Sequence, residues 1–69
     1  MEMKWKDGYT INVRVEERSV VISANKEGLL SLASQLKDLA NEDVGSHCHY
    51  DEFNSLEDGS SELIIEIIG

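Results

Sequence analysis

Two histidines and a carboxylate occupy every second position in the second half of the chain, as His47-x-His49-x-Asp51. Successive side chains of a strand point to opposite faces, so a strand here would place all three groups on one face. Imidazoles and carboxylates are ligands for Zn²⁺ or Fe²⁺. Residues i and i+4 of a strand, however, lie ~13 Å apart, too far to share an ion through bonds of ~2 Å. We therefore expect a polar strand that faces solvent or a partner, without a metal, and we keep a small metal-binding protein using His47 and His49 as an alternative.

Cys48 lies between the two histidines, which raises the question of a Cys/His nucleophile. Neighbouring strand residues point apart, so neither imidazole would reach the Cys48 sulfur, and we expect this residue to be a half-buried apolar side chain. The serines form no nucleophile elbow, and the sequence has no glycine-rich phosphate loop. Adjacent carboxylates also point apart, which argues against acid/base catalysis at three pairs: Glu42/Asp43, Asp51/Glu52 and Glu57/Asp58. The sequence predicts neither an enzyme nor a cofactor.

The chain is acidic, and its charged residues are unevenly distributed. Six Lys or Arg residues against fourteen Asp or Glu residues give a formal net charge of −8 over 69 residues. Residues 1–26 are near neutral, whereas residues 27–69 contain ten of the acidic residues and a single basic one, Lys37. Recognition of phosphates needs clustered Lys and Arg. We therefore expect no nucleic-acid partner, and we expect a partner protein that is basic.

Length and apolar pattern limit the compartment and the size of the core. A chain this short forms one small domain with little room for a deep catalytic cavity. No segment approaches the ~20 apolar residues that span a bilayer, and the charged residues at the start do not resemble a signal peptide. Cys48 is the only cysteine and cannot form an internal disulfide. We expect a cytoplasmic protein that does not bind a membrane.

The hydrophobic pattern predicts four strands and one helix in the order ββαββ. Alternation over residues 9–16 and a β-branched run over residues 19–24 indicate a hairpin. A helix of about four turns follows, capped by Asn25, and residues 46–51 and 61–68 predict the last two strands. We expect a single α+β domain: a four-stranded, mainly antiparallel sheet with one helix packed on one face, which leaves the other face open.

One face of the predicted helix is apolar. Its leucines and alanines recur at helical spacing, with two more leucines on the flanks: Leu29, Leu32, Ala33, Leu36, Ala40, and beside them Leu30 and Leu39. The opposite side is polar: Ser31, Ser34, Gln35, Lys37 and Asp38. We expect the leucines at 29, 32, 36 and 39 to pack on strand residues Val13, Val15, Ile22, Leu63 and Ile65. Gly28 is unfavourable in the first turn, so either the helix begins later or another backbone comes close to it.

Three segments together resemble a known family: Asn25-Lys26-Glu27-Gly28-Leu29-Leu30-Ser31-Leu32-Ala33, His47-Cys48-His49-Tyr50-Asp51, and Leu56-Glu57-Asp58-Gly59-Ser60-Ser61-Glu62-Leu63-Ile64-Ile65. Their order and spacing resemble the small predicted immunity proteins of bacterial polymorphic toxin systems, of the immunity protein 32 type. The similarity covers about residues 20–67. It implies an α+β domain that binds and neutralises a cognate toxin in the bacterial cytoplasm, without catalysis.

The predicted open sheet face and the acidic loop beside it are the expected partner-binding surface. It comprises the polar side of the third strand and the exposed carboxylates that follow it: His47, His49, Asp51, Glu52, Glu57 and Asp58. Negative charge there would attract a basic toxin and accelerate its association. The second alternative to toxin binding, besides the metal-binding protein, is a structural module that pairs with itself through its sheet as a homodimer.

Overall fold

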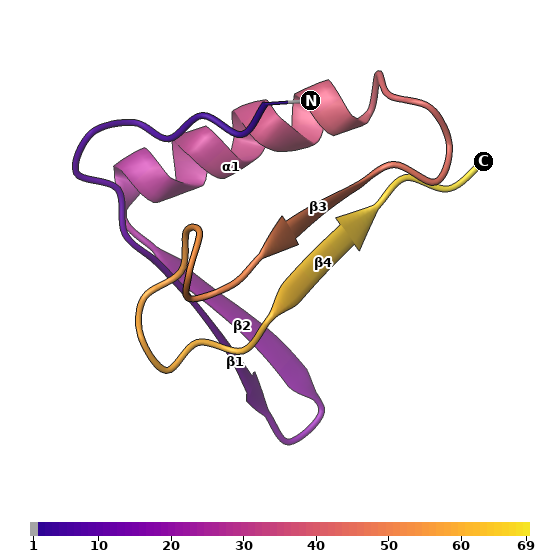
Figure 1. Ribbon diagram of the computed structural model, residues 1–69. Coiled ribbons are helices and arrows are strands. Elements are labelled where there is room, and N and C mark those ends of the chain that lie inside the picture. Colours follow the sequence, from indigo (N-terminus) through magenta and orange to yellow (C-terminus); the bar gives the residue numbers. More distant parts are fainter. Residues whose placement is uncertain (1) are drawn as a thin grey trace.

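The computed structural model describes residues 2–69, which form one helix and four strands (Figure 1). In chain order these are β1 (Ile11–Glu16), β2 (Ser19–Ala24), α1 (Lys26–Leu39), β3 (His47–Tyr50) and β4 (Leu63–Glu66). The expected α+β class is confirmed. No helix within the described residues is long and apolar enough to cross a membrane.

The strands pair as two separate antiparallel hairpins, β1 with β2 and β3 with β4, and not as the single four-stranded sheet that the sequence predicted. The reason lies on the outer edge of β1. Residues 57–61 run along this edge as an irregular segment: the Glu57 N–H donates to the Ile11 carbonyl (2.9 Å) and the Ser61 N–H to the Val13 carbonyl (2.7 Å). The Ser60 hydroxyl also accepts from the Val13 N–H (3.2 Å). A loop therefore uses the hydrogen-bonding groups of β1 that β4 would need.

Asn25 begins the helix as predicted. Its side-chain oxygen accepts from the Gly28 N–H (2.8 Å) and from the Thr10 N–H (3.0 Å), so it both caps α1 and fixes the chain that leads into β1. A Cβ atom at Gly28 would overlap the Thr10 carbonyl oxygen. The glycine is therefore required by the close approach of another backbone, which is one of the two explanations that the sequence left open.

The buried face of α1 is rotated from the predicted one. Leu32 and Leu39 are buried as expected, but Leu29 and Leu36 are 53% and 37% exposed, and the polar residues Ser31 and Gln35 are buried in their place. On the strands, Val13 is buried, Leu63 and Ile65 are partly buried, and two expected contacts are exposed: Val15 and Ile22.

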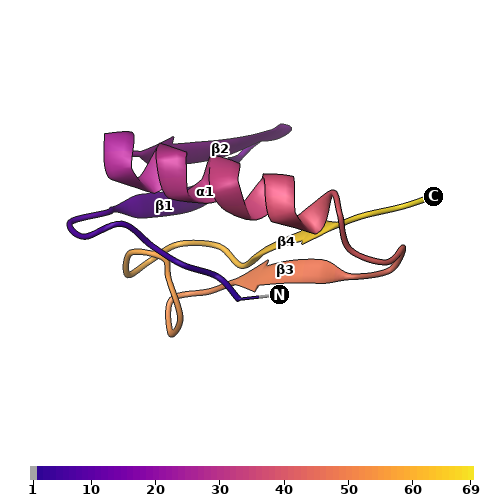
Figure 2. The same ribbon diagram turned by 90° about the horizontal axis from the view of Figure 1, so that it is seen from above.

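The N-terminal segment explains the rotation. The Lys6 N–H donates to the Ser31 hydroxyl (2.8 Å), and the Gln35 amide donates to the Lys4 carbonyl (2.8 Å). Figures 1 and 2 both show this segment running beside α1, and Figure 1 shows the two hairpins below the helix. An extended segment without a strand partner needs hydrogen bonds for its backbone, and polar helix residues satisfy that need where leucines cannot.

Aromatic side chains join the N-terminal segment to the second hairpin. Trp5 stacks on Tyr9 with ring centroids 4.4 Å apart, and its ring meets Tyr50 edge-on at 6.0 Å. Tyr50 is fully buried, and its hydroxyl donates to the Gln35 side-chain oxygen (2.9 Å). The buried apolar core around this tyrosine comprises Ile11, Val13, Leu32, Leu39, Cys48 and Leu56.

Candidate partner-binding surface

Side chains of β3 alternate between the core and the outside, as the sequence predicted. Cys48 and Tyr50 are buried, His47 is exposed, and the side chain of His49 is less than half exposed. The register of the hairpin places His47 opposite Glu66 and His49 opposite Ile64, so these four residues share the outer face. Burial raises the pKa of Tyr50, and the neighbouring Cys48 side chain adds to this effect. The core side of β3 is thus structural and its outer side is available for binding.

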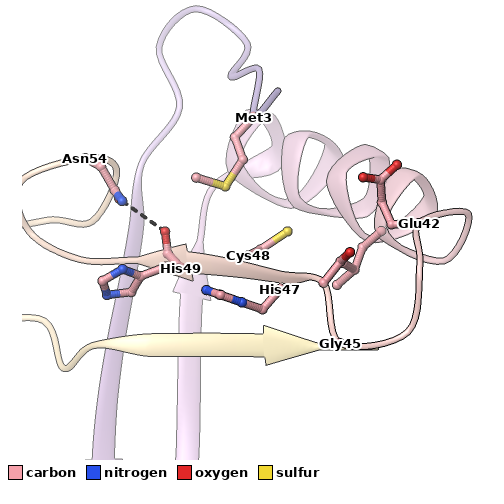
Figure 3. A pocket seen from close by; sticks show the side chains of 9 residues that line it. Met3, Glu42, Gly45, His47, Cys48, His49 and Asn54 are labelled. Atoms are coloured by element: carbon pink, nitrogen blue, oxygen red, sulfur yellow. Dashed lines mark hydrogen bonds between the residues drawn. The ribbon is translucent and has the colours of Figure 1, made fainter. Parts of the chain in front are cut away.

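A groove of about 610 Å³ lies between the free edge of β3, the end of α1 and the N-terminal segment. Its lining includes Met3, Leu39 and Cys48. Figure 3 shows the Cys48 sulfur on the side of β3 that faces α1 and Met3, while the imidazoles of His47 and His49 lie on the other side of the strand. The arrangement is therefore that of an apolar cysteine beside two outward histidines, and it does not form a Cys/His nucleophile.

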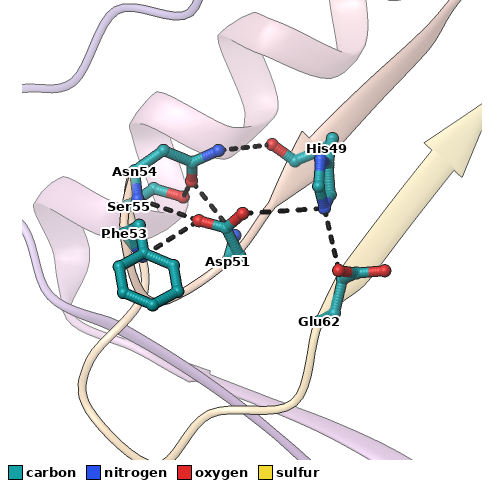
Figure 4. Close-up of polar contacts among 6 residues, drawn as sticks. All are labelled: His49, Asp51, Phe53, Asn54, Ser55 and Glu62. Atoms are coloured by element: carbon teal, nitrogen blue, oxygen red, sulfur yellow. Dashed lines mark hydrogen bonds and ion pairs between the residues drawn. The ribbon is translucent and has the colours of Figure 1, made fainter.

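His49 lies between two carboxylates (Figure 4). Its Nε2 atom is buried, and it lies 3.7 Å from an Asp51 oxygen and 3.1 Å from a Glu62 oxygen. Sequence reasoning placed His49 and Asp51 together but missed Glu62. The position of Glu62 follows from the hairpin register. Tyr50 pairs with Leu63, so Asp51, which follows Tyr50, lies beside Glu62, which precedes Leu63.

His47 does not join this cluster, since the contacts of the His49 imidazole are to Asp51 and Glu62. Among residues 2–69, no group of three or more His, Cys, Asp or Glu side chains is placed to hold a metal ion. The arrangement of His47, His49 and Asp51 in one row, which a straight strand would produce, is interrupted because β3 ends at Tyr50 and the chain turns at Asp51.

Residues 51–56 form a compact loop fixed by its own polar groups (Figure 4). One Asp51 carboxylate oxygen accepts from the N–H groups of Phe53 (2.9 Å) and Asn54 (3.0 Å). The Asn54 side chain donates to the His49 carbonyl (2.9 Å) and accepts from the Asp51 N–H (3.1 Å). Leu56 is buried in the core and anchors the other end. The loop therefore presents its outer side chains in a defined geometry.

The exposed side chains of residues 51–58, which we call the acidic loop, include three carboxylates and one aromatic ring. Glu52, Glu57 and Asp58 are exposed, and Glu52 accepts from the Gly59 N–H (2.7 Å). Phe53, the only phenylalanine of the chain, is 97% exposed. Sequence reasoning missed Phe53, although a lone aromatic residue between Glu52 and Asn54 in a turn-forming segment was the available signal.

These features define a small acidic α+β domain whose hairpin and loop present histidines, carboxylates and an aromatic side chain to the outside. The family model described as Immunity protein 32 matches residues 19–68. The chain belongs to this family of immunity proteins. No curated protein and no solved structure matches the chain.

Proposed function

We propose that this chain binds and neutralises a cognate bacterial toxin domain in the cytoplasm, without catalysis, through the outer face of β3 and the acidic loop that follows it. Membership of the Immunity protein 32 family supports a toxin as the partner. The structural observation that supports this surface is Phe53, almost fully exposed on a loop that hydrogen bonds fix in place. An ordered aromatic side chain binds a protein pocket with little loss of conformational entropy, which is the usual property of an interface anchor.

The charge around Phe53 defines the partner surface. The carboxylates beside it belong to Glu52, Glu57 and Asp58, and within residues 27–69 the only basic residue is Lys37. A complementary toxin surface would have an apolar depression for the phenyl ring, surrounded by Lys and Arg. In this arrangement the carboxylates accelerate encounter, and the phenyl ring slows release once it is buried.

Kinetics with the toxin domain encoded beside this chain test the proposal. Phe53→Ala should accelerate dissociation by about tenfold or more, as expected for an anchor worth ~1.4 kcal/mol or above. The triple lysine variant, Glu52→Lys with Glu57→Lys and Asp58→Lys, should associate several-fold more slowly, and its association rate should depend less on salt. His47→Ala and His49→Ala should each accelerate release if the imidazoles are desolvated on contact.

Two matched controls separate this surface from general effects of exposure and charge. The control for Phe53→Ala is Val44→Ala, which removes another exposed apolar side chain. The control for the triple lysine variant combines Glu2→Lys, Asp7→Lys and Glu17→Lys, which makes the same charge change in the near-neutral part of the chain. Both controls should bind like the parent protein. If the Phe53 variant and the triple lysine variant both bind the toxin with the rates of the parent protein, the assigned surface is refuted. If the parent protein itself neither binds nor inhibits the toxin, the proposed function is refuted.

A further inference from the structure

The outer edge of β2 has backbone groups available for pairing. The carbonyl groups of Ile11 and Val13 in β1 accept hydrogen bonds from the N–H groups of Glu57 and Ser61. The backbone polar groups of Ile11 and Val13 therefore point away from β2. Residues opposite each other in an antiparallel ladder point their N–H and C=O groups either toward or away from each other. Ile22, the register partner of Val13, therefore points its N–H and C=O groups away from β1, and so does Val20 two residues earlier.

The side chains along this edge are apolar and exposed. Val15 and Val20 face each other across the hairpin and are 60% and 62% exposed, and Ile22 beside them is also exposed. They lie on the hairpin face that buries Ile11 and Val13, so the core face continues beyond the part that α1 covers. The strand Ser19–Ala24 contains no charged residue and no proline, the two features that commonly keep an exposed strand edge from pairing.

The charge distribution favours a second copy of the chain as the occupant of this edge. Each chain has a net charge of −8, because residues 27–69 contain ten acidic residues and one basic residue, whereas residues 1–26 contain five basic and four acidic residues. The strand β2 lies in this near-neutral part and is itself uncharged. Figure 2 shows β2 and β3 at opposite sides of the molecule, with β1 and β4 between them. The end of the acidic loop lies on the edge of β1 that faces away from β2. Two copies that meet along β2 therefore have both β1 strands between their acidic loops, which limits electrostatic repulsion.

We propose that β2 pairs antiparallel with β2 of a second copy, which joins two β1–β2 hairpins into one four-stranded sheet. Val20 of each chain lies opposite Ile22 of the other, so that backbone N–H and C=O groups bond across the interface and the apolar side chains pair on one face. The two-fold axis passes beside Val21, and the interface is self-complementary. The surface assigned to toxin binding stays open in the dimer.

Sedimentation equilibrium of the full chain from about 1 μM to about 1 mM tests the proposal, because small interfaces dissociate in this range. The parent protein should shift from monomer to dimer as its concentration rises. Val20→Lys should weaken the dimer at least about tenfold, since it places a lysine on the pairing edge. The control Ile64→Lys makes the same change at an exposed strand residue of the other hairpin, and it should leave the dimer intact.

Amide hydrogen exchange identifies the contact itself. The Val20 and Ile22 amides should exchange more slowly at concentrations where the dimer forms, and dilution or Val20→Lys should remove this protection. A chain that remains monomeric at the highest concentration overturns the proposal, and so does a dimer that Val20→Lys does not weaken. Val20→Lys should bind the toxin normally and Phe53→Ala should dimerise normally, so failure of the dimer and failure of the proposed function are distinguishable.

Discussion

Replacing Gln35 tests whether buried polar groups, and not the predicted leucine face, hold α1 in place. Gln35 is 2% exposed, donates to the Lys4 carbonyl and accepts from the Tyr50 hydroxyl. Gln35→Leu keeps the volume but leaves both partners without a hydrogen bond, and each loss costs about 1–3 kcal/mol. Because water can reach the exposed Lys4, we expect a total loss of about 2–4 kcal/mol, which is much of the ~5 kcal/mol available to so small a domain.

Urea unfolding of four variants measures this effect: Gln35→Leu, Leu36→Ala, Tyr50→Phe and the double variant Gln35→Leu/Tyr50→Phe. Leu36→Ala is the control. This substitution would lower the free energy of unfolding by about 2–5 kcal/mol if Leu36 were buried, but it should lower it by ~1 kcal/mol at the observed exposure of this side chain. Tyr50→Phe added to Gln35→Leu removes the unpaired hydroxyl, so the double variant should lose less stability than the two single losses combined. A larger loss for Leu36→Ala than for Gln35→Leu would refute the helix orientation described above.

Two further changes have defined outcomes. Gly28→Ala should lower the melting temperature although alanine favours helices, because the new Cβ would overlap the Thr10 carbonyl oxygen; a rise in melting temperature would contradict this close approach. Burial raises the pKa of Tyr50 above the ordinary tyrosine value of about 10. The unfolded chain therefore loses this proton first, and the contribution of Tyr50 to stability should be complete below about pH 10 and fall above it by up to ~1.4 kcal/mol per pH unit. Tyr50→Phe should make the decline measured by urea unfolding less steep, and an unchanged slope would count against the burial effect.

The sequence predicted the parts of the candidate surface that depend on neighbouring residues. Alternation along β3 depends only on strand geometry, so the outward direction of His47 and the inward direction of Cys48 could be inferred without a tertiary structure. Glu62 and Phe53 could not be assigned in this way. The position of Glu62 beside His49 requires the register of β3 with β4, and the presentation of Phe53 requires the hydrogen bonds that fix the loop.

The sequence alone determined the local elements: the Asn25 cap, the β1–β2 hairpin and the alternation of β3. Each of these follows from contacts within a few residues or from a short turn, where propensity and side-chain spacing are sufficient. The tertiary structure decided the rotation of α1 and the division of the strands into two hairpins. Both depend on backbone groups of distant irregular segments, residues 4–6 against the helix and residues 57–61 against β1, which must find hydrogen-bond partners once they are buried. Side-chain hydrophobicity does not report those backbone needs, and so the apolar pattern placed Leu32 and Leu39 correctly but predicted burial of Leu29 and Leu36 where Ser31 and Gln35 are buried.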